Sequence, residues 1–304
     1  MSQGGSAISL IRRDTIRTHV KQLFHLDKVP SFLPESIKPL FRPLSPVYSS
    51  LKNGIYRRLS EQEMTTPYGI TLLVEPSNYV ERSIAEGKFE AEYVDYFIDF
   101  VEDTDTVFYD IGANIGFFSL LHAQRAGDSS VTVAFEPLPR NVSRLKKNVA
   151  LNPPLSIDLH EVGLSNANGR ATLSVSDDRP GEASLTGQNV TSDTEREITI
   201  SLSKLDGIDE SLPAEPDIVK IDVEGAEFNV LDGMESLLCK HQPDILLELH
   251  PELLRAEGRQ TEDIRTILKE NGYTRVYHVE RDQEQSLAEF GLEAHSAGNH
   301  FHFS

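Results

Sequence analysis

Short apolar runs alternate with amphipathic segments from about residue 104 onward, and this alternation is the main pattern in the chain. Runs with the length and composition of buried strands lie at 106–110, 131–135, 156–162, 217–222 and 244–249. Segments with helical periodicity lie at 117–126, 137–152, 226–240 and 261–271. Gly272 supplies a C-terminal cap for the last of these helices. Strands that alternate with helices predict an α/β fold with a mostly parallel sheet and helices on both faces.

Further segments extend this core on both sides. The stretch 65–75 predicts a strand pair, and 89–101 predicts a helix that leads into the main domain. Alternating apolar residues flank a polar loop and predict a β-hairpin insertion, with strands at 171–175 and 198–202. A closing pair of strands is predicted at 274–279 and 300–303. Right-handed crossovers place the ligand site of such a sheet at the carboxyl ends of its strands, so the residues that end those strands are the candidates for chemistry.

The first 60 residues have a different pattern. Residues 8–24 combine helical periodicity with Arg and Lys between the apolar positions, and five prolines between 30 and 46 indicate a stiff connector. A basic amphipathic helix either lies on an anionic membrane surface or packs on an acidic body, and the sequence leaves both open. We therefore predict a basic helical and Pro-rich extension over 1–60 and a main domain over 61–304.

Charge divides the chain at the same boundary. Residues 1–60 carry a net charge of +7 and residues 61–304 a net charge of -26, within a total of -19. A body this acidic repels a phosphate backbone, so we expect no nucleic-acid partner. Only 11 of the 29 basic residues are Lys, which suits either a halophilic protein in a salt-rich cytoplasm or an ordinary acidic enzyme.

Cysteine usage and the N-terminus bear on the compartment. The single cysteine, Cys239, excludes an internal disulfide framework and a Cys-based zinc cluster. The N-terminal residues lack the apolar core of a secretion signal, and no apolar run approaches the ~20 residues of a membrane-spanning helix. We expect a cytoplasmic protein, with peripheral contact at the inner membrane face if residues 8–24 bind lipid.

The first motif with chemical content is the strand-to-helix turn from Asp110 to Gly116, with the sequence Asp-Ile-Gly-Ala-Asn-Ile-Gly. Gly112 permits a tight turn, and Gly116 permits close packing of strand and helix. Glu136 ends the next strand, where a carboxylate accepts both hydroxyls of a ribose. The turn lacks the Gly-x-Gly-x-x-Gly pattern of dinucleotide sites, and Asp110 would repel phosphate. A cofactor with cationic groups, such as S-adenosylmethionine, suits it better than NAD, and a nicotinamide-dependent oxidoreductase stays the weaker alternative.

The second motif follows two neighbouring strands. Lys220, Asp222 and Glu224 are spaced to share a face, and Glu248 and His250 repeat this spacing in the next strand. All five are candidate catalytic residues beside the transferred methyl group. A carboxylate or imidazole there takes the proton of an acceptor hydroxyl, or Asp222 and Glu248 bind Mg²⁺, which lowers the pKa of that hydroxyl. Salt bridges, helix capping and loop hydrogen bonds are the structural alternatives for the same residues.

Four stretches together resemble the FkbM family of S-adenosylmethionine-dependent methyltransferases, over about residues 64–280. They are Gly-Lys-Phe-Glu at 87–90, the turn at 110–116, Ala-Phe-Glu-Pro at 134–137 and Lys-Ile-Asp-Val-Glu-Gly-Ala-Glu at 220–227. The resemblance implies a class I methyltransferase domain with a Rossmann-like sheet, usually of seven strands with the last one antiparallel. It also implies O-methylation of a sugar, a glycan or another hydroxylated small molecule, and the basic N-terminus suggests a glycolipid acceptor. A catalytically silent module that keeps the cofactor fold stays the alternative from a different class.

The resemblance also implies which residues bind the cofactor. These positions are Glu90, Asp110, Gly112, Asn114, Gly116, Glu136, Pro137, Val162 and Gly163. The glycine turn would flank the methionine part of the cofactor, and Glu136 would hold the ribose. Glu90 would close over the cofactor from the preceding helix, whereas Val162 and Gly163 would lie near the adenine.

Overall fold

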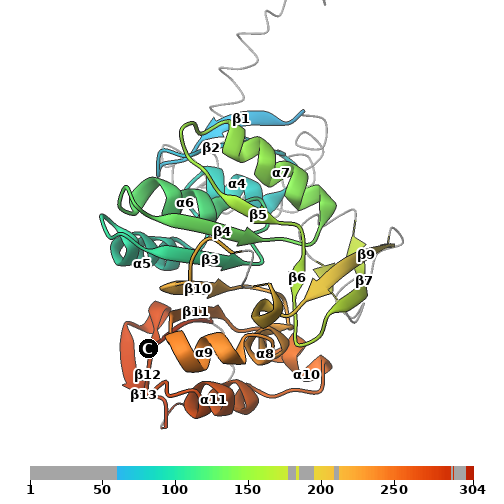
Figure 1. Cartoon of the computed structure of the whole chain (residues 1–304). Coiled ribbons are helices and arrows are strands. Elements are labelled where there is room, and N and C mark those ends of the chain that lie inside the picture. Colours follow the sequence, from blue (N-terminus) through green and yellow to red (C-terminus); the bar gives the residue numbers. More distant parts are fainter. Residues whose placement is uncertain (1–59, 177–182, 185–194, 209–211, 289, 291–298) are drawn as a thin grey trace, which may run out of the picture. The chain divides into compact units, whose positions relative to one another are not determined.

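The computed structural model describes residues 60–176, 183–184, 195–208, 212–288, 290 and 299–304 (Figure 1). The basic extension, with the predicted helix at 8–24 and the Pro-rich segment, lies outside these residues and stays a prediction. Among the residues that the structure describes, no helix is both long and apolar enough to cross a membrane.

An eight-stranded mixed sheet forms the centre of the described domain, and its strands other than β14 are labelled in Figure 1. In spatial order they are β13 (Gln283–Ser286), β12 (Arg275–His278), β14 (His300–Phe303), β11 (Asp244–Glu248), β10 (Ile218–Ile221), β3 (Val107–Ile111), β4 (Val131–Phe135) and β5 (Asp158–His160). The five strands from β11 to β5 are parallel, whereas β14 is antiparallel to both of its neighbours. The predicted α/β fold class is confirmed. The strand β13 adds one strand to the implied seven, because it pairs antiparallel with the outer edge of β12.

Each face of the sheet is covered by helices because successive strand residues point to opposite sides. On one face, residues such as Tyr109 and Val219 share a buried core with four helices. These are α8 (Glu227–Asp232), α9 (Glu235–His241), α10 (Pro251–Ala256) and α11 (Thr261–Glu270). On the other face, Phe108 and Ile218 share a core with α4 (Tyr79–Ala85), α5 (Ala91–Val101) and α6 (Phe117–Arg125). The helix α7 (Pro139–Ala150) packs there on Ala134.

The helix predicted at 226–240 is two helices, α8 and α9, rather than one. The chain bends at Gly233, and a β-carbon there would lie 2.0 Å from the carbonyl oxygen of Ser165. Periodicity alone could not reveal this tertiary contact. The helices α4 and α10 (Pro251–Ala256) were also not predicted, since seven and six residues are too few for a helical period to be recognised.

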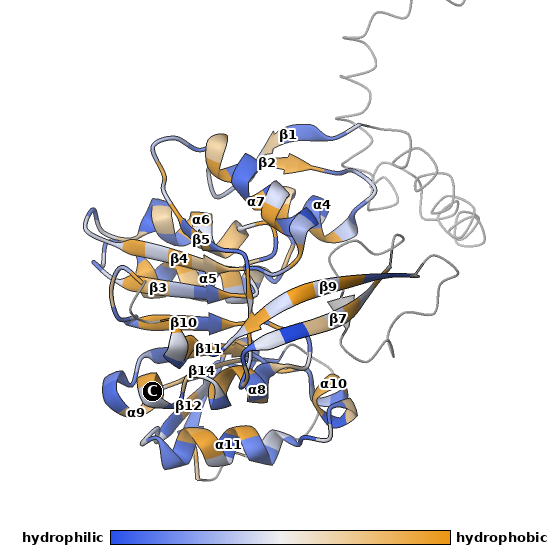
Figure 2. Cartoon of the chain, turned by 45° about the vertical axis from the view of Figure 1, so that its right-hand side comes forward, coloured by the Kyte–Doolittle hydropathy of each residue, from blue (hydrophilic) through white to orange (hydrophobic). Residues whose placement is uncertain are grey.

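Two smaller sheets flank the main one, and both predicted hairpins are confirmed. The strands β1 (Gln62–Thr65) and β2 (Thr71–Val74) form an antiparallel pair. The insertion pairs β7 (Gly169–Ser176) with β9 (Glu195–Ser203), and β6 (Gly163–Leu164) joins β9 in parallel. The short strand β8 (Ala183–Ser184) pairs with β7. Figure 2 shows this insertion beside the main sheet, with orange apolar residues along both β7 and β9.

The turn after β3 is held in close backbone contact with the end of β10. Gly112 has a φ of 79°, and a β-carbon there would lie 1.9 Å from the carbonyl oxygen of Asp222. Gly116, with a φ of 84°, lies against Leu145 of α7 at a corresponding distance of 2.7 Å. Glycine is therefore required at position 112 for two reasons: its backbone is left-handed, and the backbone that follows β10 leaves no space for a β-carbon.

We expect Gly112→Ala to destabilise the fold far more than a left-handed glycine requires by itself. Gly258 is the matched control, because its φ is 75° and no atom lies within 4 Å of the position that a β-carbon would occupy. Gly258→Ala should cost only the left-handed strain of ~1–2 kcal/mol. Gly112→Ala should cost about 1–3 kcal/mol more, because the backbone of β10 must also move. Chemical denaturation of both variants measures the difference, and equal losses would contradict the close approach of β3 and β10.

Candidate functional site

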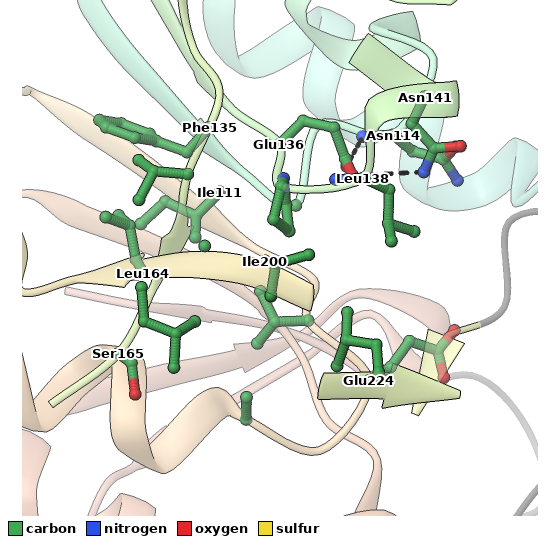
Figure 3. A pocket seen from close by; sticks show the side chains of 18 of the residues that line it. Ile111, Asn114, Phe135, Glu136, Leu138, Asn141, Leu164, Ser165, Ile200 and Glu224 are labelled. Atoms are coloured by element: carbon green, nitrogen blue, oxygen red, sulfur yellow. Dashed lines mark hydrogen bonds between the residues drawn. The ribbon is translucent and has the colours of Figure 1, made fainter. Parts of the chain in front are cut away.

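A cavity of about 150 Å³ lies at the carboxyl ends of β3, β4 and β10, beside the hairpin insertion (Figure 3). One part of its wall is apolar and comes from the chain after β5 and from the hairpin: Val162, Leu164, Leu173, Ile200 and Leu202. The other part is polar: Asn114, Glu136, Asn141, Asp222 and Glu224. A cavity with both an apolar and a polar, acidic part of its wall suits a ligand whose ends differ chemically.

Glu136 is held by hydrogen bonds from both sides of the crevice between β3 and β4. Its Oε2 accepts from the backbone N–H of Asn114 at 2.8 Å, and its Oε1 accepts from the backbone N–H of Leu138, also at 2.8 Å. The side-chain amide of Asn141 donates to the same Oε1 at 3.3 Å. Figure 3 shows Glu136 between these donors. Each carboxylate oxygen has two lone pairs, so the fixed carboxylate still offers acceptor capacity to a ligand.

Burial changes the acidity of this carboxyl. Glu136 is 4% exposed, and its burial raises the pKa of the carboxyl to about 7. The three hydrogen bonds lower this pKa, whereas the negative charge of Asp110 raises it. The hydrogen bonds favour the carboxylate, but the loss of water outweighs them. A ligand that donates two hydroxyls would further favour the charged form.

The structure places the residues predicted from sequence in two groups. Eight of them line the cavity: Gly112, Asn114, Glu136, Pro137, Val162, Gly163, Asp222 and Glu224. Six are not among its lining residues: Glu90, Asp110, Gly116, Lys220, Glu248 and His250. Asp222 belongs to the first group and contacts the second, so it joins the cavity to a buried cluster of charges.

Lys220 is a buried cation between two carboxylates. It pairs with Asp110 across the parallel register of β10 and β3, which puts both side chains on one face of the sheet. Its Nζ lies 3.6 Å from Asp110 Oδ1 and 3.4 Å from Asp222 Oδ2, and 5.0 Å from the centre of the Phe118 ring. Asp110 is 1% exposed and also accepts a hydrogen bond of 2.6 Å from Ser119. The acid before the glycine turn therefore directly contacts Lys220 and Ser119.

The pKa values of Lys220 and Asp222 are both raised. Burial alone would lower the pKa of Lys220, but the carboxylates of Asp222 and Asp110 raise it above its ordinary value. Burial and the neighbouring Glu248 raise the pKa of Asp222, against the opposing effect of Lys220. A carboxylate with a raised pKa is a better proton acceptor than an ordinary aspartate, and Asp222 faces the cavity.

A second cluster surrounds Glu248 at the end of β11. The Nε2 of His250 lies 3.4 Å from Glu248 Oε1, and the Nε2 of His300 lies 3.6 Å from Glu248 Oε2. Glu90 Oε2 is 3.3 Å from the same His300 nitrogen. Glu248 and His300 are partners in the antiparallel register of β11 and β14, so the sheet itself brings them together.

The carboxylates in this cluster favour positive charge on both imidazoles. Burial would lower the pKa of His250, but Glu227 and Glu248 raise it to about 11. Burial would likewise lower the pKa of His300, and the carboxylates of Glu248, Glu280 and Glu90 raise it to about 11. Neither histidine is therefore a ready proton acceptor at neutral pH, and Asp222 is the better candidate for that role.

Sequence reasoning missed His300, Tyr93 and the apolar wall formed by the hairpin. His300 is far from the other site residues in the chain and reaches them only through the antiparallel pairing of β14. The alternation His300-Phe301-His302-Phe303 was the available signal, because it puts histidine on one face of a closing strand. Tyr93 is buried and stacks on His300 with ring centres 4.0 Å apart.

A family profile and two curated relatives indicate the class of enzyme. The sequence profile described as "Methyltransferase FkbM domain" matches residues 110–275. The hexuronic acid methyltransferase AglP of Haloferax volcanii is 31% identical over 185 residues, which cover 60% of this chain and 70% of that protein. Methyltransferase 1 of Beauveria bassiana is 27% identical over 172 residues, covering 49% of this chain and 69% of that protein.

Among solved structures, similarity is weaker. The FkbM methyltransferase of Methylobacillus flagellatus aligns with a TM-score of 0.41 and 15% identity, covering 88% of this chain and 60% of that one. The family profile spans more than half of the sequence and includes the glycine turn, Glu136, Lys220, Asp222 and Glu248. The chain belongs to the FkbM methyltransferase family and is an S-adenosylmethionine-dependent methyltransferase.

Proposed function

We propose that this protein transfers a methyl group from S-adenosylmethionine to a hydroxyl of a sugar or glycan, and that the cavity beside Glu136 binds the cofactor. The observation that carries the cofactor assignment is the fixed, buried Glu136 carboxylate between an apolar slot and acidic groups. The proposal for the acceptor is supported by the similarity to a hexuronic acid methyltransferase.

The side chains that line the cavity fit each part of this cofactor. Val162, Ile200 and Leu202 offer an apolar surface for the adenine, and Glu136 offers oxygens for the two ribose hydroxyls. Asp222 and Glu224 offer negative charge to the sulfonium and amino groups. The cavity therefore offers a group of suitable polarity or charge to each part of the cofactor.

Asp222 is the residue proposed to move the proton. When bound, S-adenosylmethionine supplies a methyl carbon whose bond to sulfur breaks, with its electron pair left on sulfur, as the acceptor oxygen attacks in line. Asp222 takes the proton that this oxygen loses, and Lys220 then stays beside a protonated rather than an anionic partner. The buried pair of Lys220 and Asp110 holds the end of β10 in place during the reaction.

Two further predictions from the sequence stay proposals. Contact of residues 8–24 with a membrane would suit a lipid-linked glycan, and it concerns residues outside those that the structure describes. Mg²⁺ binding by Asp222 and Glu248 would lower the pKa of the acceptor hydroxyl. The imidazoles beside Glu248 make the site less suited to Mg²⁺, which prefers oxygen ligands.

Full-length protein incubated with labelled S-adenosylmethionine and a panel of neutral hexosides, amino sugars and hexuronic acids should yield a methyl ether on a sugar hydroxyl. Asp222→Asn should lower turnover about 100-fold or more, a larger factor than its loss of cofactor affinity, because it removes the proton acceptor as well as one negative charge of the cavity. Asp128→Asn is the control, since Asp128 is exposed in a turn before β4. Methyl ester formation, methylation of no sugar in the panel, or full activity of Asp222→Asn would each contradict a part of the proposal.

Glu136→Gln should weaken binding of S-adenosylhomocysteine by about 10- to 100-fold, measured by calorimetry. The variant loses charged hydrogen bonds worth ~1.5–3 kcal/mol and turns an amide donor toward the backbone N–H groups of Asn114 or Leu138. The control is Glu161→Gln, because the Glu161 side chain is 55% exposed and pairs only with Lys146 among the ion pairs described. Unchanged binding by the Glu136 variant would remove the ribose role.

Binding of S-adenosylhomocysteine should weaken at acid pH with a midpoint near the pKa of Glu136, which burial raises to about 7. The carboxylate accepts the ribose hydroxyls and the protonated form accepts them less well, so affinity is highest above this pKa and falls below it. The dissociation constant should be about tenfold higher at pH 6 than at pH 8. Glu136→Gln should abolish this dependence, and a wild-type profile that is flat between these values would overturn the assignment.

A further inference from the structure

We propose that Glu90, Glu248 and His300 form a binding site for a divalent transition-metal ion, next to the cofactor cavity. One nitrogen or oxygen atom from each of the three residues lies within 4.8 Å of the others. They come from the start of α5, the end of β11 and the start of β14, three segments that only the folded sheet brings together. The ion binding proposed here does not require the acceptor, whereas any part of the ion in catalysis rests on the proposed function.

The spacing of the donor atoms fits a shared ion. The Nε2 of His300 lies 3.3 Å from Glu90 Oε2 and 3.6 Å from Glu248 Oε2. A direct N–H···O hydrogen bond is shorter, ~2.9 Å. Two ligands that each lie ~2.0–2.2 Å from a shared ion are ~2.8–3.6 Å apart, for octahedral or tetrahedral geometry. The observed separations are long for a direct hydrogen bond; they are those of ion pairs and also those of ligand atoms around one ion.

A buried nitrogen at the centre of the triad makes no regular hydrogen bond. His300 is 4% exposed, and its Nε2 makes no hydrogen bond that satisfies geometric criteria among the described residues. The hydroxyl of Tyr93, whose ring stacks on His300, is likewise buried without a hydrogen-bond partner there. Buried polar atoms are rarely left in this state, so the Nε2 of His300 calls for a ligand.

A carboxylate behind the histidine fixes its orientation. The Nδ1 of His300 donates a hydrogen bond to Glu280, which is 14% exposed. Histidines that bind metals almost always donate their other ring N–H to a carboxylate or carbonyl, which fixes the ring orientation. The ion would take the place of the proton that the carboxylates otherwise hold on Nε2, so binding would release one proton. Glu280 therefore presents the Nε2 of His300 to Glu90 and Glu248 in the orientation that a metal requires.

Charge also favours this triad over the neighbouring one of Asp222, Glu248 and His250. Asp222 already faces the ammonium of Lys220 at 3.4 Å, so a cation already compensates one carboxylate of that triad. Three carboxylates lie around each imidazole: Glu224, Glu227 and Glu248 around His250, and Glu90, Glu248 and Glu280 around His300. A divalent cation would compensate this excess of buried negative charge.

The donor set selects the kind of ion. One imidazole with two carboxylates suits Zn²⁺, Mn²⁺, Fe²⁺ or Co²⁺, whereas Mg²⁺ and Ca²⁺ prefer oxygen ligands alone. Glu248 links this triad to Asp222 and so to the cofactor cavity, since Asp222 and Glu248 interact electrostatically. An ion here would bind the acceptor oxygen and lower the pKa of the hydroxyl whose proton Asp222 takes.

Cobalt titration of the full-length protein, after dialysis against a chelator and in the absence of cofactor and acceptor, tests this site. We expect about one Co²⁺ per chain, with visible absorption from an imidazole–carboxylate complex and a higher melting temperature. His300→Gln and Glu90→Gln should each weaken binding by at least about tenfold, and Glu280→Gln should weaken it by about 10- to 100-fold through misorientation of His300. Glu90 is the safer substitution for folding, because its side chain is 25% exposed.

His241→Gln is the matched control, because His241 also lies within 4 Å of a carboxylate, 3.7 Å from Glu215, but on the surface of α9. It should bind Co²⁺ like the wild type.

Absence of stoichiometric binding, or wild-type binding by folded Glu90→Gln and His300→Gln, would overturn the site. Loss of binding in Asp222→Asn and His250→Gln but not in Glu90→Gln would also overturn it, since the ion would then lie in the other triad. Because no cofactor is present, failure here leaves the proposed methyl transfer to be judged by its own experiments.

Discussion

Buried charge at the carboxyl ends of parallel strands must be paired, and this constraint organises the whole site. Lys220 meets it by lying between Asp110 and Asp222, which ties β10 to β3. Glu136 meets it with backbone N–H groups from both sides of the crevice between β3 and β4. Since unpaired buried charges cost several kcal/mol each, the position of each strand end is coupled to the charges that it carries.

The same constraint divides the site into two chemically different parts. The cavity holds one fixed carboxylate beside an apolar wall, as a nucleoside requires. The cluster beyond it concentrates carboxylates and imidazoles around Glu248, as a cation requires. Asp222 belongs to both parts, because it lines the cavity and also contacts Lys220. The proposed transfer to a hydroxyl needs this adjacency, since donor and proton acceptor must meet the same oxygen.

Much of the fold could be predicted from sequence because the parallel strands are short apolar runs with clear turns between them. The ends of these strands carry Glu136, Asp222 and Glu248, so the edge of the sheet that holds the cavity followed from the topology alone. The resemblance to the FkbM family added the expected roles, and the family itself is confirmed by the profile match. The individual roles of these residues stay predictions.

What the sequence did not reveal depends on contacts between distant segments. His300 faces Glu248 through the antiparallel register of β14, which no local pattern encodes. Gly112 was expected to permit a tight turn, and the structure adds a second requirement, because a β-carbon there would meet the backbone of Asp222. The bend at Gly233 and the apolar wall from the hairpin arise in the same way. Local periodicity reports burial along an element, but it does not report the partner on the other side.

A crystal structure of the full-length protein with S-adenosylhomocysteine tests the cofactor assignment most directly, because it locates the nucleoside without relying on activity. We expect both ribose hydroxyls within hydrogen-bond distance of the Glu136 carboxylate, ~2.5–3.0 Å, with the adenine against Val162 and Ile200. A nucleoside bound outside this cavity, or bound within it with the ribose hydroxyls turned away from Glu136, would contradict the assignment.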